Sequence, residues 1–346
     1  MNIPRSLIIA GGKGSRFGGL TTTRPKHVVP VLGIPLVDHH IQALEGVSPI
    51  RFSYSGFNQD FLDRYFEENH AERIKEGSLI PQLDLEMKGP LFPLVELVAE
   101  RHAKKEEGDV IALTGDMFGH VDLAELTQFH QQQGRPITLV ATRTFPAPKA
   151  CVFDVNGNNA LDGFRRLEGV SAEEDLINLG VYVASPELLQ VIGTGLPKYK
   201  EDVIFDILAK EGALSVYVAE GRAVNINTPY QFLCANLDEL RRHVAAGDTV
   251  EGRIDLETKT YVGNFATVSP DAKVSDSVIC PGSVVEPGAK LKNVVLLQDT
   301  YVDSGTKLEN VIVDQGVRLE NATLRDTIAL SQGELQPMPM HYTFED

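Results

Sequence analysis

Branched aliphatic residues recur with a constant period of 17 residues beyond residue 260. Three registers keep this period: Val268, Val285, Val302 and Leu319 form the first, Val274, Leu291 and Leu308 the second, and Ile279, Leu296 and Val313 the third. Turn-forming pairs such as Pro281-Gly282 and Ser304-Gly305 lie between these positions. A repeat this short cannot bury its own apolar face, so successive units must stack and share one core. An ordinary β-sandwich would not keep one period through three registers.

The repeat resembles the hexapeptide-repeat left-handed β-helix, in which three flat sides form one triangular coil. We expect a short left-handed parallel β-helix of about four coils over residues 261–330. The preceding polar stretch, residues 241–260, is predicted to be a linker, and residues 331–346 form a Gln-, Pro- and Met-rich tail without a clear pattern.

Short apolar runs alternate with amphipathic patterns between residues 7 and 235. The runs predict strands at Leu7–Ala10, Val110–Leu113, Thr138–Ala141 and Val181–Ala184, and the amphipathic patterns predict helices at Val37–Leu44, Phe61–Phe66, Leu94–Lys104 and Leu123–Gln133. A closing helix is expected over residues 230–245. This alternation predicts an α/β domain over residues 1–240, with a mostly parallel sheet that binds ligands at the carboxyl ends of its strands.

A glycine-rich loop follows the first predicted strand, with Gly11, Gly12 and Gly14. Glycines allow backbone N–H groups to approach a phosphate chain closely. The loop lacks the Gly-Lys-Ser/Thr ending of a P-loop, and Phe17 stands where a dinucleotide-binding loop needs a glycine. Because the net charge is −16, an anionic substrate needs a local positive pocket, for which Arg16, Arg24 and Lys26 are candidates.

Five elements follow in order within residues 11–36: Gly-Gly-x-Gly-x-Arg, Leu-Thr, Pro-Lys, Pro-Val and Gly-x-Pro-Leu. They resemble the signature of the nucleotide-sugar pyrophosphorylases, which are sugar-1-phosphate nucleotidyltransferases. The resemblance implies a Rossmann-like nucleotidyltransferase domain before the β-helix. It also implies transfer of a nucleotidyl group from a nucleoside triphosphate to a sugar-1-phosphate, with release of pyrophosphate and with Mg²⁺ as cofactor.

The resemblance implies a role for each matching position. The residues concerned are Ala10, Gly11, Gly12, Gly14, Ser15 and Gly89 for nucleotide binding, Arg16 and Lys26 as catalytic cations, Asn178, Gly180 and Arg166 for sugar binding, and Asp116 and Asn225 for the metal. Asp116 follows a predicted strand and matches the first metal-binding aspartate of the family. Asn178 and Gly180 belong to an Asn-x-Gly-x-Tyr segment.

Three positions depart from the family pattern. The family's second metal-binding aspartate lies in a Trp-x-Asp-Ile-Gly-Thr-Pro segment, and here Asn225 stands in its place, with the register given by Ile226, Thr228 and Pro229. An amide oxygen can bind Mg²⁺, but it brings no negative charge. The usual sugar-phosphate lysine is replaced near residue 167, where Arg165 or Arg166 would substitute, and the family's Gly-Thr-Ala segment is reduced to Gly89 and its neighbours.

Two functions therefore remain open from the sequence. One is an active sugar-1-phosphate nucleotidyltransferase. The other is a catalytically weakened member that binds a nucleotide or nucleotide sugar and regulates a partner, which Asn225 and Leu167 favour. An acyltransferase role for the repeats is disfavoured, because that chemistry uses a histidine on the coils and residues 261–330 contain none.

Composition also indicates which partners and which cellular compartment to expect. The negative net charge argues against a nucleic-acid or anionic-membrane surface, and no apolar run approaches the roughly 20 residues of a membrane-spanning helix. Cys151, Cys234 and Cys280 are odd in number and far apart, which indicates a reducing compartment. We expect a cytoplasmic protein that forms a homo-oligomer through or near the β-helix.

Overall fold

The structure is a computed structural model that describes residues 3–86, 88–143, 147–193, 195–196, 198–220, 223–247 and 250–340. The described residues pack into two compact units. The first unit contains the residues up to Lys13 and Val37–Asn225, and the second contains Gly14–Leu36 and the residues from Ile226 onward. Packing therefore groups residues 14–36 with the β-helix, which no sequence pattern indicated.

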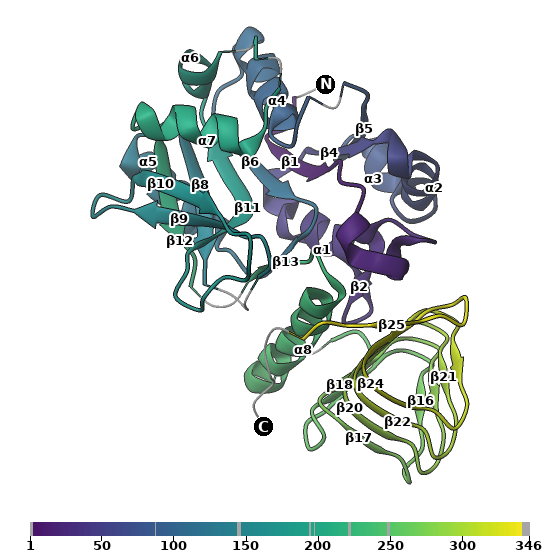
Figure 1. The fold of residues 1–346 in the computed structure, drawn as a ribbon. Coiled ribbons are helices and arrows are strands. Elements are labelled where there is room, and N and C mark those ends of the chain that lie inside the picture. Colours follow the sequence, from purple (N-terminus) through teal and green to yellow (C-terminus); the bar gives the residue numbers. More distant parts are fainter. Residues whose placement is uncertain are drawn as a thin grey trace. The chain divides into compact units, whose positions relative to one another are not determined.

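The first unit is built on a sheet with the strand order β10-β9-β11-β6-β1-β4-β5, in which β8 joins β11 to β12 (Figure 1). The strands are β1 (Ser6–Ala10), β4 (Ile50–Ser55), β5 (Leu79–Asp84), β6 (Val110–Thr114), β8 (Ile137–Thr142), β9 (Cys151–Val155), β10 (Leu161–Arg166), β11 (Ile177–Ala184) and β12 (Leu214–Val218). Strands β6, β1, β4 and β5 are parallel, whereas β11 runs antiparallel to β6 and β8. Every residue of β1 is buried, as expected for a strand covered on both faces. The predicted Rossmann-like sheet is confirmed.

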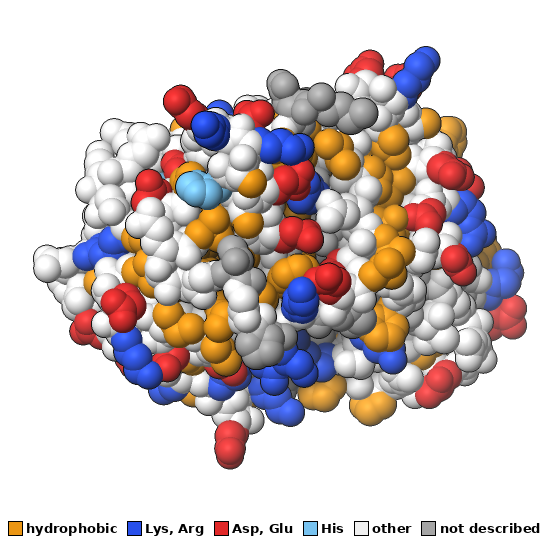
Figure 2. All heavy atoms as spheres, turned by 90° about the horizontal axis from the view of Figure 1, so that it is seen from above, with side chains coloured by type: hydrophobic (Ala, Val, Ile, Leu, Met, Phe, Trp, Pro, Cys, Tyr) orange, Lys and Arg blue, Asp and Glu red, His pale blue; other side chains and the backbone are white. Residues whose placement is uncertain are grey.

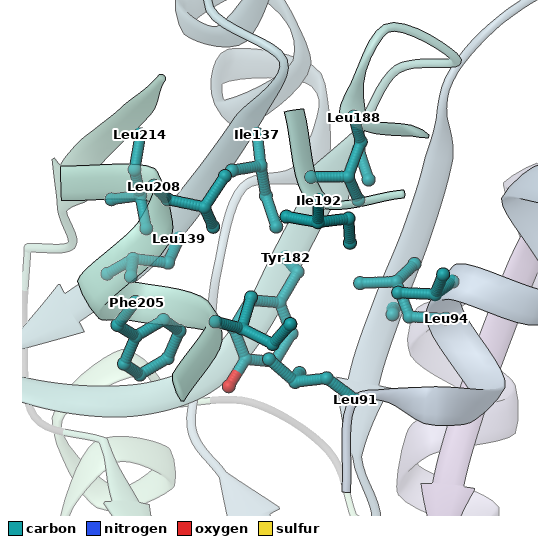
Figure 3. Close-up of a cluster of buried hydrophobic side chains, with 14 of the residues drawn as sticks. Leu91, Leu94, Ile137, Leu139, Tyr182, Leu188, Ile192, Phe205, Leu208 and Leu214 are labelled. Carbon is teal, nitrogen blue, oxygen red and sulfur yellow. The ribbon is translucent and has the colours of Figure 1, made fainter. Parts of the chain in front are cut away.

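Helices of the first unit agree with the four predicted patterns. They are α1 (Leu36–Ala43), α2 (Gln59–Asn69), α3 (Ala71–Glu76), α4 (Phe92–Ala103), α5 (Leu123–Gln133), α6 (Leu188–Ile192) and α7 (Glu201–Lys210). The side chains of α4, α6 and α7 pack with those of β8, β11 and β12 in one apolar cluster, in which the ring of Tyr182 lies among Leu91, Ile192 and Phe205 (Figure 3). This cluster fixes α7 against β11, and both elements carry polar residues described below.

The second unit contains the predicted β-helix. Its strands are β14 (Arg253–Asp255), β15 (Thr260–Val262), β16 (Thr267–Val268), β17 (Lys273–Ser275), β18 (Ser277–Ile279), β19 (Val284–Val285), β20 (Lys290–Leu296), β21 (Tyr301–Val302), β22 (Lys307–Val313), β23 (Arg318–Leu319), β24 (Thr323–Ala329) and β25 (Leu335–Pro337). The 17-residue period is confirmed as strand register, since Val268 pairs with Val285, Val285 with Val302, and Val302 with Leu319. The last coil is one residue shorter, because Leu308 pairs with Leu324.

Corners between the flat sides use residues in the left-handed conformation. Asn293, Asn310 and Asp326 occupy one corner of successive coils with φ of 54°, 54° and 49°. Asn and Asp tolerate this conformation because their short side chains bond locally. Here the bonds run along the helix instead: Asn293 Nδ2 donates to Asn310 Oδ1 at 3.1 Å, and Asn310 Nδ2 donates to Asp326 Oδ1 at 2.8 Å. The ladder joins neighbouring coils at this corner.

Both ends of the larger β-helix sheet are covered by antiparallel strands of the same chain. Strand β14 pairs with β15 at one end, and β25 pairs with β24 at the other. Exposed sheet edges invite pairing with other chains, and these strands remove much of that exposure. The predicted linker and the predicted tail therefore both contain strands that close the β-helix.

Helix α8 (Pro229–Ala246) packs along β18, β20 and β22. It begins with a capping box in which the Thr228 hydroxyl accepts from the Gln231 N–H and the Gln231 side chain accepts from the Thr228 N–H. Further along the helix, Asn236 Oδ1 accepts the N–H of Leu32 at 3.0 Å. This bond holds residues 14–36 on α8; that segment contains the 3₁₀ turns η1 (Ser15–Thr21) and η2 (Lys26–Val28) and the strands β2 (Pro30–Val31) and β3 (Ile34–Pro35).

In the part of the chain that the structure describes, no helix combines the length and apolar character needed to cross a membrane. On the face drawn in Figure 2, acidic and basic side chains lie interspersed among apolar and uncharged ones.

Candidate active site

In the first unit, the glycine-rich loop and Asp116 leave neighbouring parallel strands at the same edge of the sheet. Ile9 in β1 lies opposite Thr114 in β6, and the Gly115 N–H donates to the Ile9 carbonyl at 2.7 Å. Ala10, which ends β1, is fully buried. The carboxyl ends of parallel strands are the usual ligand-binding edge of such sheets. The predicted location of both motifs is therefore observed.

Asp116 and Asn225 are brought together by a small antiparallel pair of strands. Strand β7 (Met117–Phe118) directly follows Asp116 and pairs with β13 (Val224–Asn225), with Asn225 opposite Met117. The Asn225 side-chain amide donates from Nδ2 to the Asn178 carbonyl at 2.8 Å. Its Oδ1 is buried and has no hydrogen-bond partner among the described residues. The Asn225 side chain thus keeps one amide oxygen without a hydrogen bond, opposite the residue that follows the half-buried Asp116.

The Asn-x-Gly segment of β11 packs against the strand that precedes Asp116. Asn178 is only 6% exposed, and its Oδ1 accepts the Gly180 N–H at 3.0 Å. Gly180 has φ of +83°, and a Cβ there would lie 2.1 Å from Thr114 Oγ1. No side chain fits at this position. The first unit therefore groups Asn178, Gly180, Asp116 and Asn225 around the end of β6.

A buried polar network continues from Asn178 to α7. Asn178 Nδ2 donates to the Tyr182 hydroxyl at 3.1 Å, and that hydroxyl donates to Glu201 Oε1 at 3.3 Å. Figure 3 shows the oxygen of Tyr182 at the margin of the apolar cluster that encloses its ring. Burial, together with the nearby Glu201 carboxylate, raises the pKa of Tyr182 well above its usual value. The phenol therefore stays protonated and fixes Glu201.

Arg166, predicted to bind the sugar phosphate, is held by carboxylates. Its guanidinium lies 2.9 Å from Glu201 Oε2 and 2.8 Å from Asp202 Oδ1. The neighbouring Arg165 pairs with Asp175 at 2.9 Å. The ion pairs raise the pKa of Arg166 even though burial opposes the shift. Both arginines are therefore already paired with carboxylates, with which a phosphate would compete.

The remaining nucleotide-binding candidates of the first unit differ in environment. A Cβ at Gly11 or Gly12 would meet no atom within 4 Å, so the protein itself leaves this space open. Beside them, the Lys13 ammonium lies 4.6 Å from the centre of the Phe57 ring. Gly89 is different: a Cβ there would lie 2.6 Å from the Tyr199 carbonyl oxygen, so chain packing alone requires glycine.

In the second unit, Arg16 and Lys26 converge on one amide oxygen. Asn227 Oδ1 accepts from Arg16 Nη2 at 3.0 Å and from Lys26 Nζ at 3.1 Å. Gly14, with φ of +70°, precedes the exposed Ser15 at the start of η1. Lys26 is only 7% exposed, whereas Arg16 is on the surface. Two cations aimed at a single oxygen form a site suited to an anionic oxygen.

Arg24 does not belong to this cluster, although the sequence made it a candidate. Its guanidinium binds Asp314 of the β-helix at 2.8 Å. The positive charge of Arg24 is therefore neutralised by a carboxylate of the second unit.

Residues 5–218 match the nucleotidyl transferase family. The chain belongs to this family. Residues 248–324 match the GlmU-like C-terminal hexapeptide family, in line with the β-helix. The predicted nucleotidyltransferase is thereby confirmed.

Similar proteins carry related assignments. The chain is 27% identical over 281 residues to a Sulfolobus acidocaldarius protein assigned as a mannose-1-phosphate guanyltransferase, covering 79% of this chain and 75% of that protein. It is 27% identical over 274 residues to the mannose-1-phosphate guanylyltransferase catalytic subunit beta of Danio rerio, covering 76% and 74%. A Bacillus anthracis structure assigned as a glucose-1-phosphate thymidylyltransferase shares the fold, with a TM-score of 0.56, 15% identity, and coverage of 72% of this chain and 97% of that one.

The donor set of this nucleotidyl transferase fits Mg²⁺ rather than a metal caged by protein. Within the described ranges, no group of three or more His, Cys, Asp or Glu residues is placed to hold a metal ion. Asp116 offers a carboxylate, and Asn225 offers the unpartnered Oδ1. Mg²⁺ usually takes one or two protein carboxylates and completes its shell with phosphate oxygens and water. Asp116 and Asn225 meet that requirement, but they bring one negative charge fewer than the two aspartates of the family pattern.

Sequence reasoning missed three residues of this nucleotidyl transferase. Asn227 stands at the glycine position of the family's Asp-Ile-Gly-Thr-Pro segment, and that substitution was a readable signal. Glu201 gave none. His40 belongs to no motif; it is buried, and its Nε2 donates to the Met117 carbonyl at 2.7 Å. Burial lowers the pKa of His40 to about 4, so a neutral imidazole supports β7.

Proposed function

We propose that this chain transfers a nucleotidyl group from a nucleoside triphosphate to a sugar-1-phosphate, and that the substrates are GTP and mannose-1-phosphate. The convergence of Arg16 and Lys26 on one oxygen position carries the proposal, because the same geometry suits a phosphate oxygen of the triphosphate. The names of the relatives support the choice of base and sugar.

The reaction needs no general base. An oxygen of the sugar phosphate, already anionic, attacks the α-phosphorus, and the bond from that phosphorus to the bridging oxygen of the β-phosphate breaks. Pyrophosphate leaves with the electron pair. Catalysis then depends on positioning the two anions and on neutralising the charge that repels them.

Each group of residues has a part in this scheme. The backbone N–H groups of residues 11–15 bind the triphosphate, and Arg16 and Lys26 neutralise its charge. The open space beside Gly11 and Gly12 supports this role, because packing within the protein does not explain these glycines. Gly89 is proposed only as a wall of the nucleotide site, since its packing against residue 199 accounts for it.

Asp116 and Asn225 would hold Mg²⁺. When bound, the ion would offset charge on the triphosphate and make the α-phosphorus more electrophilic. The residues themselves supply the orientation: β7 pairs with β13, and the Asn178 carbonyl fixes the Asn225 amide so that Oδ1 remains available.

The sugar is proposed to bind along β11. Asn178 and Gly180 present backbone and amide groups there, and the Glu201 carboxylate is held in the same network. Carboxylates and amides are suitable partners for sugar hydroxyl groups. Arg166 would bind the sugar phosphate after exchanging a carboxylate partner.

The setting and assembly are also proposals. The three cysteines all lie among the described residues, where they are buried and form no disulfide, and this supports a reducing, cytoplasmic location. Homo-oligomerisation through or near the β-helix remains our expectation. Because β14 and β25 cover the ends of the larger sheet, the flat sides or the sheet formed by β16, β19, β21 and β23 would provide the contact.

Pyrophosphate release across a grid of nucleoside triphosphates and hexose-1-phosphates, with Mg²⁺, tests the proposal. We expect the highest kcat/KM with GTP and mannose-1-phosphate, and no release when the sugar phosphate is omitted. A higher kcat/KM for another pair would overturn the substrate choice, and no release for any pair would overturn the reaction.

Asn225 favours a second function, in which the chain binds nucleotide or nucleotide sugar without turnover and regulates a partner. The loss of one metal-binding carboxylate is the observation behind it. If a triphosphate raises the Tm while no pair in the grid releases pyrophosphate, binding without catalysis is established.

A further inference from the structure

The segment that carries Arg16 and Lys26 is fastened to the last coil of the β-helix. Arg24 Nη2 lies 2.8 Å from Asp314 Oδ1, and the side chains are 10% and 1% exposed. Asp314 directly follows β22. A buried ion pair of this kind is costly to break from one side, because the remaining charge has lost both water and its partner.

Asp314 is itself held by three backbone groups. Its N–H donates to the Ala329 carbonyl at 2.8 Å, and its Oδ1 accepts the Gln315 N–H at 2.8 Å. Its Oδ2 accepts the Ser331 N–H at 3.4 Å. The Asp314 carboxylate that pairs with Arg24 is therefore held in place by its own coil, independently of the arginine.

A second attachment lies at the glycine pair of η1. The Gly19 N–H donates to Gln336 Oε1 at 3.2 Å. A Cβ at Gly19 would lie 2.1 Å from the Cδ1 atom of Leu330, a buried residue that follows β24. The backbone at Gly19 is therefore in direct contact with the side chains of Gln336 and Leu330.

Both attachments fall between the two cations in sequence. The order is Arg16, Gly19, Arg24 and Lys26, with Pro25 extended (φ −62°, ψ 149°) between the last two. Only one residue therefore separates the buried ion pair from Lys26. Because proline fixes φ, a displacement of the Arg24 backbone would also displace Lys26.

We propose that Asp314 is a positioning residue for nucleotidyl transfer: through Arg24, the last coil of the β-helix sets where Arg16 and Lys26 meet the triphosphate. This inference rests on the proposed function. It gives the β-helix a part in substrate binding that is separate from assembly.

Asp314→Asn tests the proposal in the full-length protein. Asparagine keeps the volume and the acceptor oxygen but leaves the Arg24 charge unbalanced. We expect the KM for the triphosphate to rise about tenfold or more, because small displacements of positioning groups have large kinetic effects. The KM for the sugar-1-phosphate should change less than twofold. Glu309→Gln is the matched control, since it removes the carboxylate of the exposed Arg325–Glu309 pair on the same coils.

An unchanged KM for the triphosphate with a lowered Tm would overturn the proposal, because the pair would then be structural only. If Asp314→Asn does not fold, the double variant Arg24→Met/Asp314→Leu removes both charges together, which buried pairs tolerate better. It should fold and still show the raised KM; a KM equal to wild type would reject the inference. Wild type without triphosphate binding or turnover would instead reject the proposed function, and this inference with it.

Discussion

Lys26 Nζ lies 3.1 Å from Asn227 Oδ1, the oxygen that also accepts from Arg16. Asn227 precedes the capping box of α8, and its own N–H donates to Gln231 Oε1 at 3.0 Å. Its position is therefore set by the start of a helix. The amide oxygen of Asn227 thus brings the two cationic groups to one point without adding a negative charge there.

Asn227→Asp should weaken triphosphate binding. A carboxylate at this position would form ion pairs with Arg16 and Lys26 and compete with the triphosphate, so we expect the Kd to rise about tenfold or more. Titration calorimetry without sugar phosphate measures this. Asn158→Asp, which adds the same charge at an exposed site, is the control. Equal Kd values for Asn227→Asp and wild type would show that the cluster does not bind the triphosphate.

Asn225→Asp should make stability depend on Mg²⁺. The family pattern suggests that the fold tolerates this change, but the amide of Asn225 donates to the Asn178 carbonyl at 2.8 Å. A carboxylate cannot donate, and its oxygen would face the carbonyl, at a cost of about 1–3 kcal/mol. We expect the variant to have a lower Tm than wild type in EDTA and to recover most of the loss in Mg²⁺ with triphosphate. A Tm that the metal leaves unchanged would count against a metal site at Asn225.

Acidification should destabilise the protein through His130. This histidine is buried and its Nδ1 bonds Thr138 Oγ1 at 2.8 Å. Burial lowers its pKa below the ordinary value of 6.5, against the opposing effect of Asp109. The unfolded chain then binds the proton more tightly, so the free energy of unfolding falls as the pH drops below about 6.5.

His130→Asn keeps a partner for Thr138 without the titration. The drop in Tm between pH 7.5 and 5.5 should therefore be smaller for this variant than for wild type. Part of the drop should remain, because the buried His40 also has a lowered pKa. His102→Gln, at an exposed site, should match wild type. A drop as large in His130→Asn as in wild type would exclude His130 as a source.

The two architectures were predictable because each rests on a repeated physical pattern. The 17-residue period translates directly into strand register, and the alternation of apolar runs and helices predicts the sheet of the first unit. Strands β14 and β25 gave no such signal, because short antiparallel strands at the ends of a β-helix need no period. The packing of residues 14–36 on α8 and the β-helix depends on tertiary contacts such as Arg24 with Asp314.

The site was predictable to the same extent. Asp116 and the Asn178–Gly180 segment were located by their motifs, and the structure brings them to one sheet edge. Arg24 shows the limit: sequence gives its charge, but its partner Asp314 lies 290 positions away. Asn227 could have been identified from the replaced glycine, whereas the role of Glu201 follows only from the contact of α7 with β11.

The most direct test compares wild type and Asp116→Asn in the rate of pyrophosphate formation from GTP and mannose-1-phosphate with Mg²⁺. Asparagine keeps the volume but leaves the proposed metal site without its carboxylate. Wild type should turn over, and Asp116→Asn should be slower by about a hundredfold or more at an unchanged Tm. Equal rates for the two proteins would contradict the assignment of Asp116 and, with it, the account of how this site transfers a nucleotidyl group.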